Sequence, residues 1–238
     1  MIGDRSGMLQ SAALCASIMS MRRQAKLRPG AWLLLLASAT AGANYNFDVP
    51  DDYLAGATAW PAWAKNLERH TIEREAIRRC LEDESACSGK LKSLRYILIK
   101  GAALDRDRQL RLVNRYINKR RYKVDRRQTS LSVVPGGEAE LKNHWSTLLE
   151  FLKRGGDCED YAVAKYFLLR ELGFPAEDLR VLVTYEKRAR DYHAVLAVRR
   201  DDGSSWLLES DDSIVKGNHR AYRFIYALNE EGIWDHAK

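Results

Sequence analysis

One cysteine and one histidine, 35 residues apart, carry the chemistry that this sequence could perform. Cys158 follows Gly155-Gly156-Asp157 and stands directly before an apolar-periodic segment, residues 163–172. At the N-terminus of a helix, the unpaired N–H groups and the helix dipole favour thiolate over thiol. His193 opens a later apolar run, residues 194–198. A thiol nucleophile followed by a histidine base is the order required for covalent acyl transfer.

A third group, which would orient the histidine, should be a carboxylate farther along the chain. Glu209, Asp211 and Asp212 stand at the end of the next apolar run. A hairpin closed by Asp202-Gly203 places Asp212 opposite His193. A loop one residue longer instead brings Asp211 opposite the histidine and Glu209 diagonal to it. Strand parity therefore leaves the choice among these carboxylates open.

The elements that must position these groups change character along the chain. After an irregular arm over residues 44–65, apolar residues at helical spacing predict helices over residues 67–84, 90–117, 141–152 and 163–172. The second of these is either one long helix or two helices with a break near Gly101 or Asp105, and residues 122–142 are expected to form a surface loop. Beyond Pro175 the period changes to two, which predicts antiparallel strands over residues 179–185, 193–199, 206–210 and 222–228. We therefore expect an α+β fold with a helical N-terminal half packed on an antiparallel sheet.

The first 43 residues have the features of a leader. A basic stretch over residues 21–28 precedes a short apolar core over residues 31–39, and Ala41-Gly42-Ala43 ends it with small residues. This pattern predicts a secretory signal peptide, with the true start at Met19 or Met21. A membrane anchor is the alternative, but the apolar stretch is shorter than the roughly 20 residues that span a bilayer. We expect cleavage after residue 43 and no stable membrane insertion afterwards.

The exported chain would be a single domain over residues 44–238, long enough to bury a core. It carries 34 basic and 31 acidic residues, a net charge of +3 against +7 for the full chain. This balance does not indicate a nucleic-acid partner. In an oxidising compartment Cys80 and Cys87 could form a short-loop disulfide, with two buried thiols as the alternative. Cys158 then stays unpaired, and an odd cysteine in an exported protein indicates a working thiol.

A helix carrying Cys158 packed on a sheet carrying His193 is the core of papain-like and transglutaminase-like folds. Within that class, the sequence resembles the bacterial transglutaminase-like cysteine proteinases. The resemblance covers nearly all of residues 44–238. Its most specific block is Asp157-Cys158-Glu159-Asp160-Tyr161, and further similarity lies in residues 113–118, 145–152, 155–173, 193–198 and 222–230.

The resemblance implies that Cys158 is the nucleophile and His193 the general base. The family usually has Leu-Asp-Asn-Leu where this chain has Leu208-Glu209-Ser210-Asp211. Aligning the apolar run puts Glu209 at the aspartate position, so Glu209 is the first choice for the third triad member and Asp211 the second. An orienting carboxylate can be Asp or Glu where the geometry permits.

Three carboxylates, those of Asp157, Glu159 and Asp160, crowd around the nucleophile. They would raise the pKa of the thiol, and a hard divalent cation with oxygen ligands would remove that conflict. The resemblance assigns calcium to Asp157 and Glu159, and Asp160 is either a further ligand or a helix cap. Capping and dipole compensation are the alternative for all three.

The resemblance also implies a biological setting. Family members act in the periplasm, need calcium and cleave the N-terminal region of large surface adhesins that control biofilm attachment. An inner-membrane receptor that senses cyclic di-GMP sequesters them. We therefore expect an exported, calcium-dependent cysteine endopeptidase. A transglutaminase-type acyl transferase would use the same catalytic residues, and a non-catalytic peptide-binding module would need none of them.

Overall fold

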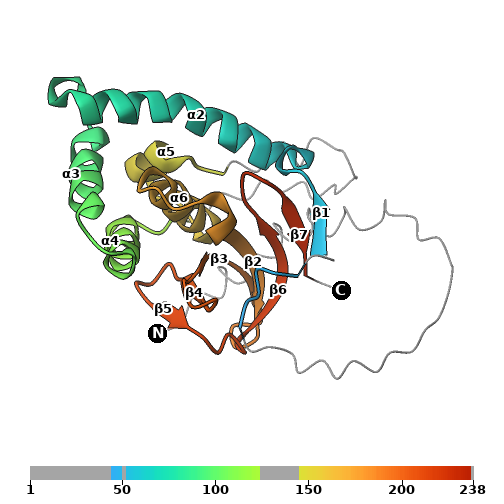
Figure 1. The fold of residues 1–238 in the computed structure, drawn as a ribbon. Helices are drawn as coiled ribbons and strands as arrows, with labels where there is room; N and C mark the ends of the chain where they lie inside the picture. Colours follow the sequence, from blue (N-terminus) through green and yellow to red (C-terminus); the bar gives the residue numbers. More distant parts are fainter. Residues whose placement is uncertain (1–43, 50–51, 124–144, 237–238) are drawn as a thin grey trace, which may run out of the picture.

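A computed structural model describes residues 44–49, 52–123 and 145–236 of the chain. The predicted leader over residues 1–43, and the predicted surface loop from residue 124 onward, lie outside the described residues. Within them, five α-helices lie beside a seven-stranded sheet, and all strands but the first follow the helices in the chain (Figure 1). The α+β class predicted from the change of period is confirmed.

Three helices form the outer wall of the helical layer (Figure 1). They are α2 (Pro61–Glu82), α3 (Lys90–Ala102) and α4 (Arg106–Asn118). The first begins six residues earlier than predicted, because Pro61 suits the first helical turn, where a missing N–H is no loss. Of the two alternatives for the second segment, two helices are observed: the side chain of Asp105 accepts a hydrogen bond from Arg108 N at 2.8 Å and starts α4.

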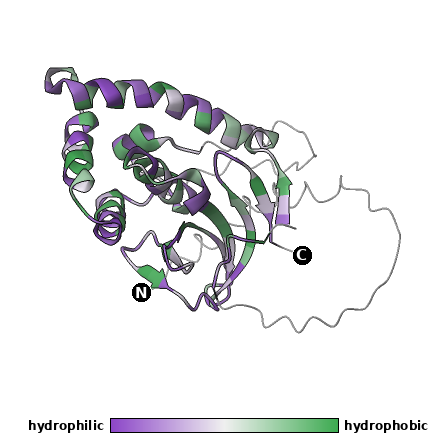
Figure 2. Ribbon diagram, in the orientation of Figure 1, coloured by the Kyte–Doolittle hydropathy of each residue, from purple (hydrophilic) through white to green (hydrophobic). Residues whose placement is uncertain are grey.

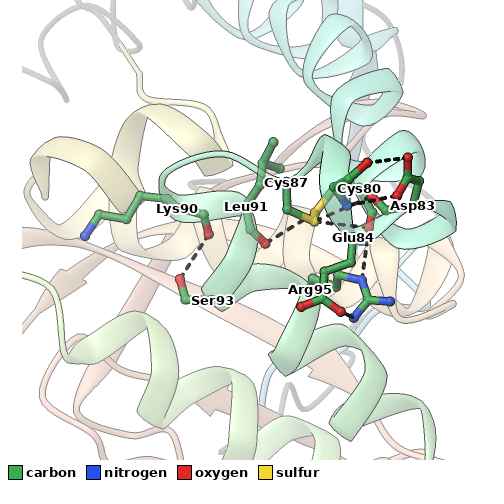
Figure 3. The surroundings of a disulfide bond; sticks show 9 residues. Cys80, Asp83, Glu84, Cys87, Lys90, Leu91, Ser93 and Arg95 are labelled. Carbon is green, nitrogen blue, oxygen red and sulfur yellow. Dashed lines mark hydrogen bonds and ion pairs between the residues drawn. A yellow bond between two sulfur atoms is a disulfide. The ribbon is translucent and has the colours of Figure 1, made fainter.

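A disulfide between Cys80 and Cys87 fixes the corner between α2 and α3 (Figure 3). Their Cα atoms lie 4.7 Å apart, so the bonded alternative is the one observed. Arg95, one turn into α3, donates from Nε to the Cys80 carbonyl at 3.0 Å and pairs with Glu84 at 3.2 Å. The corner is therefore held covalently and by polar contacts from both helices.

The sheet is antiparallel throughout, in the order β1-β7-β6-β2-β3-β4-β5. Four strands were predicted: β2 (Leu179–Glu186), β3 (Asp191–Arg199), β4 (Ser205–Leu208) and β6 (Tyr222–Leu228). Three were not: β1 (Tyr53–Ala55), β5 (Ile214–Lys216) and β7 (Ile233–Asp235). Each of these has only three residues, too few to show a period of two.

The central helix α6 (Cys158–Glu171) lies between the outer helices and the sheet (Figure 1). It follows α5 (Leu148–Arg154), which starts later than predicted, at a capping box formed by Thr147 and Glu150. Residues of α6 are buried on all sides, whereas α2 alternates hydrophilic and hydrophobic segments along its length (Figure 2). Such all-round burial marks α6 as the helix about which the domain is built.

Alternate residues of β2 and β3 belong to two core clusters. Val183 and Leu196 pack in the cluster that includes α6, whereas Leu182 and Val195 pack with Tyr45 of the N-terminal arm. The arm thus covers the face of the sheet that the helices leave uncovered. In the described part of the chain, none of the helices combines the length and apolar character needed to cross a bilayer.

Candidate active site

The loop before α6 brings two backbone segments into close contact. Gly155 has a φ of +71°, and a Cβ at this position would overlap the carbonyl oxygen of Arg121. At Gly156 a Cβ would overlap the carboxylate of Asp160, and the Gly156 carbonyl accepts a hydrogen bond from Lys123 N at 2.8 Å. Both glycines are therefore required by close approach of neighbouring groups as well as by the turn.

Cys158 is the first residue of α6 and its side chain is buried, with 6% of its surface exposed. Its thiol donates to Oε2 of Glu159 at 3.3 Å. A backbone interaction with Ala194, the neighbour of His193 on β3, favours the thiolate, but burial and the charges of Glu159 and Asp157 raise the pKa well above its usual value. The helix N-terminus alone does not ionise this thiol.

His193, near the start of β3, contacts the carboxylate of Glu209. Its Nε2 lies 2.7 Å from Glu209 Oε2, and the hydroxyl of Tyr222 donates to the other carboxylate oxygen, Oε1, at 2.6 Å. Within the described residues, Nδ1 of His193 makes no hydrogen bond. Since Glu209 occupies Nε2, Nδ1 is the nitrogen that remains for a reacting group.

Asp211 does not share this contact. Its side chain accepts a hydrogen bond from Ser213 N at 3.0 Å, and hydrogen bonding to Ser213 lowers the pKa of the carboxyl. Asp212 has a φ of 73°, which fits a turn residue rather than a strand residue. Of the three carboxylates singled out in the sequence, the structure brings Glu209 to His193.

The strand register explains this choice. Arg199 pairs with Ser205 and Leu196 with Leu208, so the same ladder, if continued, would place Asp211 opposite His193. The strand β4 ends at Leu208, however, and the next residues form a turn closed by a hydrogen bond from Glu209 N to Ser213 O at 3.1 Å. The turn moves Asp211 away from His193. Glu209, which lies diagonally across the ladder from His193, contacts the histidine instead.

The three carboxylates next to Cys158 have different environments. Asp160 accepts a hydrogen bond from Ser146 N at 2.7 Å, and Asp157, the N-cap residue of α6, makes no side-chain capping bond. Glu159 is buried, and burial together with the charges of Asp157 and Asp160 raises its pKa well above the usual value. Among the described residues, no three acidic, histidine or cysteine side chains are arranged around a common metal position.

Four polar residues near the site were not singled out in the sequence. Tyr122, which is half-exposed, lies beside the nucleophile, and its partial burial and then the charge of Cys158 raise its pKa. The other three are Tyr222, Lys165 and Asn118, and all of them donate to Glu209. Of these four, only Lys165 could have been noticed in the sequence, because it is a basic residue inside the apolar run of α6.

Trp145 fills the core, with its ring centroid 4.7 Å from that of Trp60.

Comparisons with known proteins bear on the family and the fold. The family model of the bacterial transglutaminase-like cysteine proteinases matches residues 75–236. The calcium-bound LapG of Legionella pneumophila is similar in fold, with a TM-score of 0.54 and 24% identity over 69% of this chain and 88% of that one. EGTA-treated LapG gives 0.54 and 23% identity over 68% and 86%. No curated protein matches the chain. The predicted transglutaminase-like fold is confirmed.

Proposed function

This chain belongs to the bacterial transglutaminase-like cysteine proteinases, and we propose on that premise that it is an exported, calcium-dependent endopeptidase with a Cys158-His193-Glu209 triad. One observation carries the proposal. The imidazole of His193 is held by Glu209 at 2.7 Å, while the next residue of the same strand, Ala194, interacts with the sulfur of Cys158. The proposed nucleophile, base and orienting carboxylate come from α6, β3 and the turn after β4, respectively.

The proposed reaction uses each group in turn. His193 takes the thiol proton at Nδ1, and the sulfur of Cys158 attacks the carbonyl carbon of the scissile peptide, forming a C–S bond. The imidazolium, stabilised by Glu209, gives its proton to the amide nitrogen as the C–N bond breaks and the amine leaves. Water, deprotonated by His193, then attacks the thioester carbon and releases the acid and the thiol. The Cys158 N–H at the helix N-terminus is a donor for the oxyanion.

The donor set beside Cys158 fits calcium. Asp157, which is partly exposed, and Glu159, which is buried, offer hard oxygen ligands, and burial and then the negative charges of Asp157 and Asp160 raise the pKa of Glu159. We assign calcium to these two residues, with Asp160 as a further ligand or as the group that ties the helix start to Ser146. The ion would supply positive charge that offsets the two carboxylates next to the thiol. The similarity in fold to calcium-bound and EGTA-treated LapG supports calcium as the ion.

The substrate and setting are proposed from the resemblance to the family. We propose that the enzyme acts in the periplasm on the N-terminal region of a large surface adhesin, and that an inner-membrane receptor for cyclic di-GMP sequesters it. The leader features of residues 1–43 and the Cys80–Cys87 disulfide support export. Acyl transfer to an amine would use the same triad and differs only in the acceptor.

Cleavage of an adhesin fragment tests the proposal. The N-terminal region of an adhesin encoded beside this protein is incubated with wild-type enzyme in calcium, and the products are identified by mass spectrometry. Two new fragments whose masses sum to the substrate plus one water indicate hydrolysis, whereas transfer would add the acceptor amine. Cys158→Ala and His193→Ala should be inactive, and Lys153→Met, an exposed position on α5, is the matched control. Cleavage by Cys158→Ala at the wild-type rate would overturn the mechanism.

A further inference from the structure

Side chains from two helices, α4 and α6, donate hydrogen bonds to the turn that carries Glu209. Lys165 of α6 donates from Nζ to the carbonyl oxygen of Glu209, and Asn118 of α4 donates from Nδ2 to the same oxygen at 2.8 Å. Lys165 has no exposed surface. A single backbone carbonyl, on the residue whose carboxylate contacts the histidine, thus receives two side-chain donors from different helices.

The far end of the turn is held in the same way. Asn114, one helical turn before Asn118, donates from Nδ2 to the carbonyl oxygens of Asp212 at 2.9 Å and Ser213 at 3.1 Å. The two asparagines also contact each other at 3.3 Å, from Asn118 Nδ2 to Asn114 Oδ1. Donors therefore fix both ends of a turn that has left the ladder with β3, and the backbone bond from Glu209 N to Ser213 O lies within the turn itself.

We propose that Lys165 and Asn118 are positioning residues of the triad: by fixing the Glu209 carbonyl they place the Glu209 carboxylate on Nε2 of His193. This inference rests on the proposed function. A role in packing alone does not explain the choice of residue, because burying an amine or ammonium costs far more than burying Met or Leu of similar size. The cost of burying Lys165 is offset because its side chain hydrogen-bonds to the turn that carries Glu209, which apolar contacts cannot orient.

The charges around Lys165 agree with this role. Burial lowers its pKa to about 7, and the carboxylates of Glu209, Asp212 and Asp211 act in the opposite direction. The ring of Tyr161 lies 5.8 Å from Nζ, on the same helix. Lys165 is therefore a buried amine, and the three carboxylates that favour its charged form all belong to the turn that it holds.

Two measurements that need no substrate test the inference. One is the pKa of the His193 imidazole, followed by NMR through its ring protons and assigned with His193→Gln. The other is the rate of alkylation of Cys158 by iodoacetamide in calcium buffer, followed on the peptide that contains Cys158. Both are compared in wild type, Glu209→Gln, Lys165→Met, Asn118→Leu and the double variants with Glu209→Gln. Lys153→Met is the control, and circular dichroism checks the fold.

We expect Lys165→Met and Asn118→Leu to lower the His193 pKa in the same direction as Glu209→Gln and to slow alkylation by about tenfold or more. In the Glu209→Gln background neither should add a comparable loss, because each acts through Glu209. If Lys165→Met fails to fold, Asn118→Leu gives the same comparison. Folded variants with a wild-type His193 pKa, or with losses that add fully to that of Glu209→Gln, would overturn the inference.

These outcomes separate the inference from the proposed function. If no protein is cleaved but Cys158 alkylation depends on His193 and on Lys165 as expected, endopeptidase activity fails and the positioning role stands. If His193→Gln alkylates like wild type, the triad itself is wrong and both proposals fall.

Discussion

The carboxylate of Glu209 lies 2.7 Å from Nε2 of His193, although the register of β3 and β4 points Asp211 at the histidine. Replacing each carboxylate by its amide should therefore give opposite results. Glu209→Gln removes the charge that stabilises the imidazolium, and we expect kcat/KM to fall about 10²-fold or more. Asp211→Asn keeps a side-chain oxygen for Ser213 N and should stay within about twofold of wild type. The reverse ranking would show that the turn is in a different register.

Gly155 should tolerate no side chain. Its φ of +71° and the carbonyl of Arg121 both exclude a Cβ, so Gly155→Ala should lower the free energy of unfolding by about 1–3 kcal/mol and displace the start of α6. Gly203→Ala is the matched control, because its φ is +77° but no atom lies within 4 Å of the added Cβ. Urea unfolding measures the stability, and the rate at which the variant cleaves the adhesin fragment measures the activity of the site. Equal losses of activity in the two variants would contradict a specific effect at the nucleophile loop.

Calcium removal should silence the enzyme reversibly. Asp157 and Glu159 both carry negative charge beside Cys158, so the ion should control thiol reactivity as well as local order. EGTA should abolish cleavage, added calcium should restore it, and magnesium should substitute poorly because it demands a tight octahedral shell. Asp157→Asn and Glu159→Gln should weaken calcium binding in calorimetry, with Asp211→Asn as the control. Full activity in EGTA together with no heat of calcium binding would show that Asp157 and Glu159 have a purely structural role.

Lys165 should make stability depend on pH. Its pKa in the folded protein is about 7, below the usual 10.5. The folded state therefore binds fewer protons than the unfolded state between these values, so the contribution of Lys165 to the free energy of unfolding rises as pH increases from about 7 to 10.5. Urea unfolding at pH 6.5 and pH 9 should show wild type gaining stability relative to Lys165→Met at the higher pH. The same comparison with Lys153→Met should give no change, and a constant difference for Lys165→Met would contradict the prediction.

Much of this architecture could be predicted because its signals are local. The glycines before Cys158, the break at Asp105 and the turn at Asp202-Gly203 each lie in a few adjacent residues. The change of period after Pro175 was enough to separate helices from strands.

The features that were missed depend on distant contacts. Tyr122 reaches the nucleophile only because its backbone pairs with Gly156, 34 positions later. Glu209 was the first choice through the resemblance, but strand parity alone could not choose it, because β4 stops at Leu208 and side chains from α4 and α6 hold the turn that follows. Local patterns specify the four longer strands, whereas the position of the carboxylate depends on helices far away in the sequence.

The bond between Cys80 and Cys87 leaves Cys158 as the only free cysteine in the described part of the chain. A sulfenic acid formed on Cys158 therefore has no resolving thiol among these residues. It can condense with a small external thiol or proceed irreversibly to sulfinic acid. Recovery of an oxidised enzyme thus depends on the reductants around it, and peroxide exposure without them would remove activity permanently.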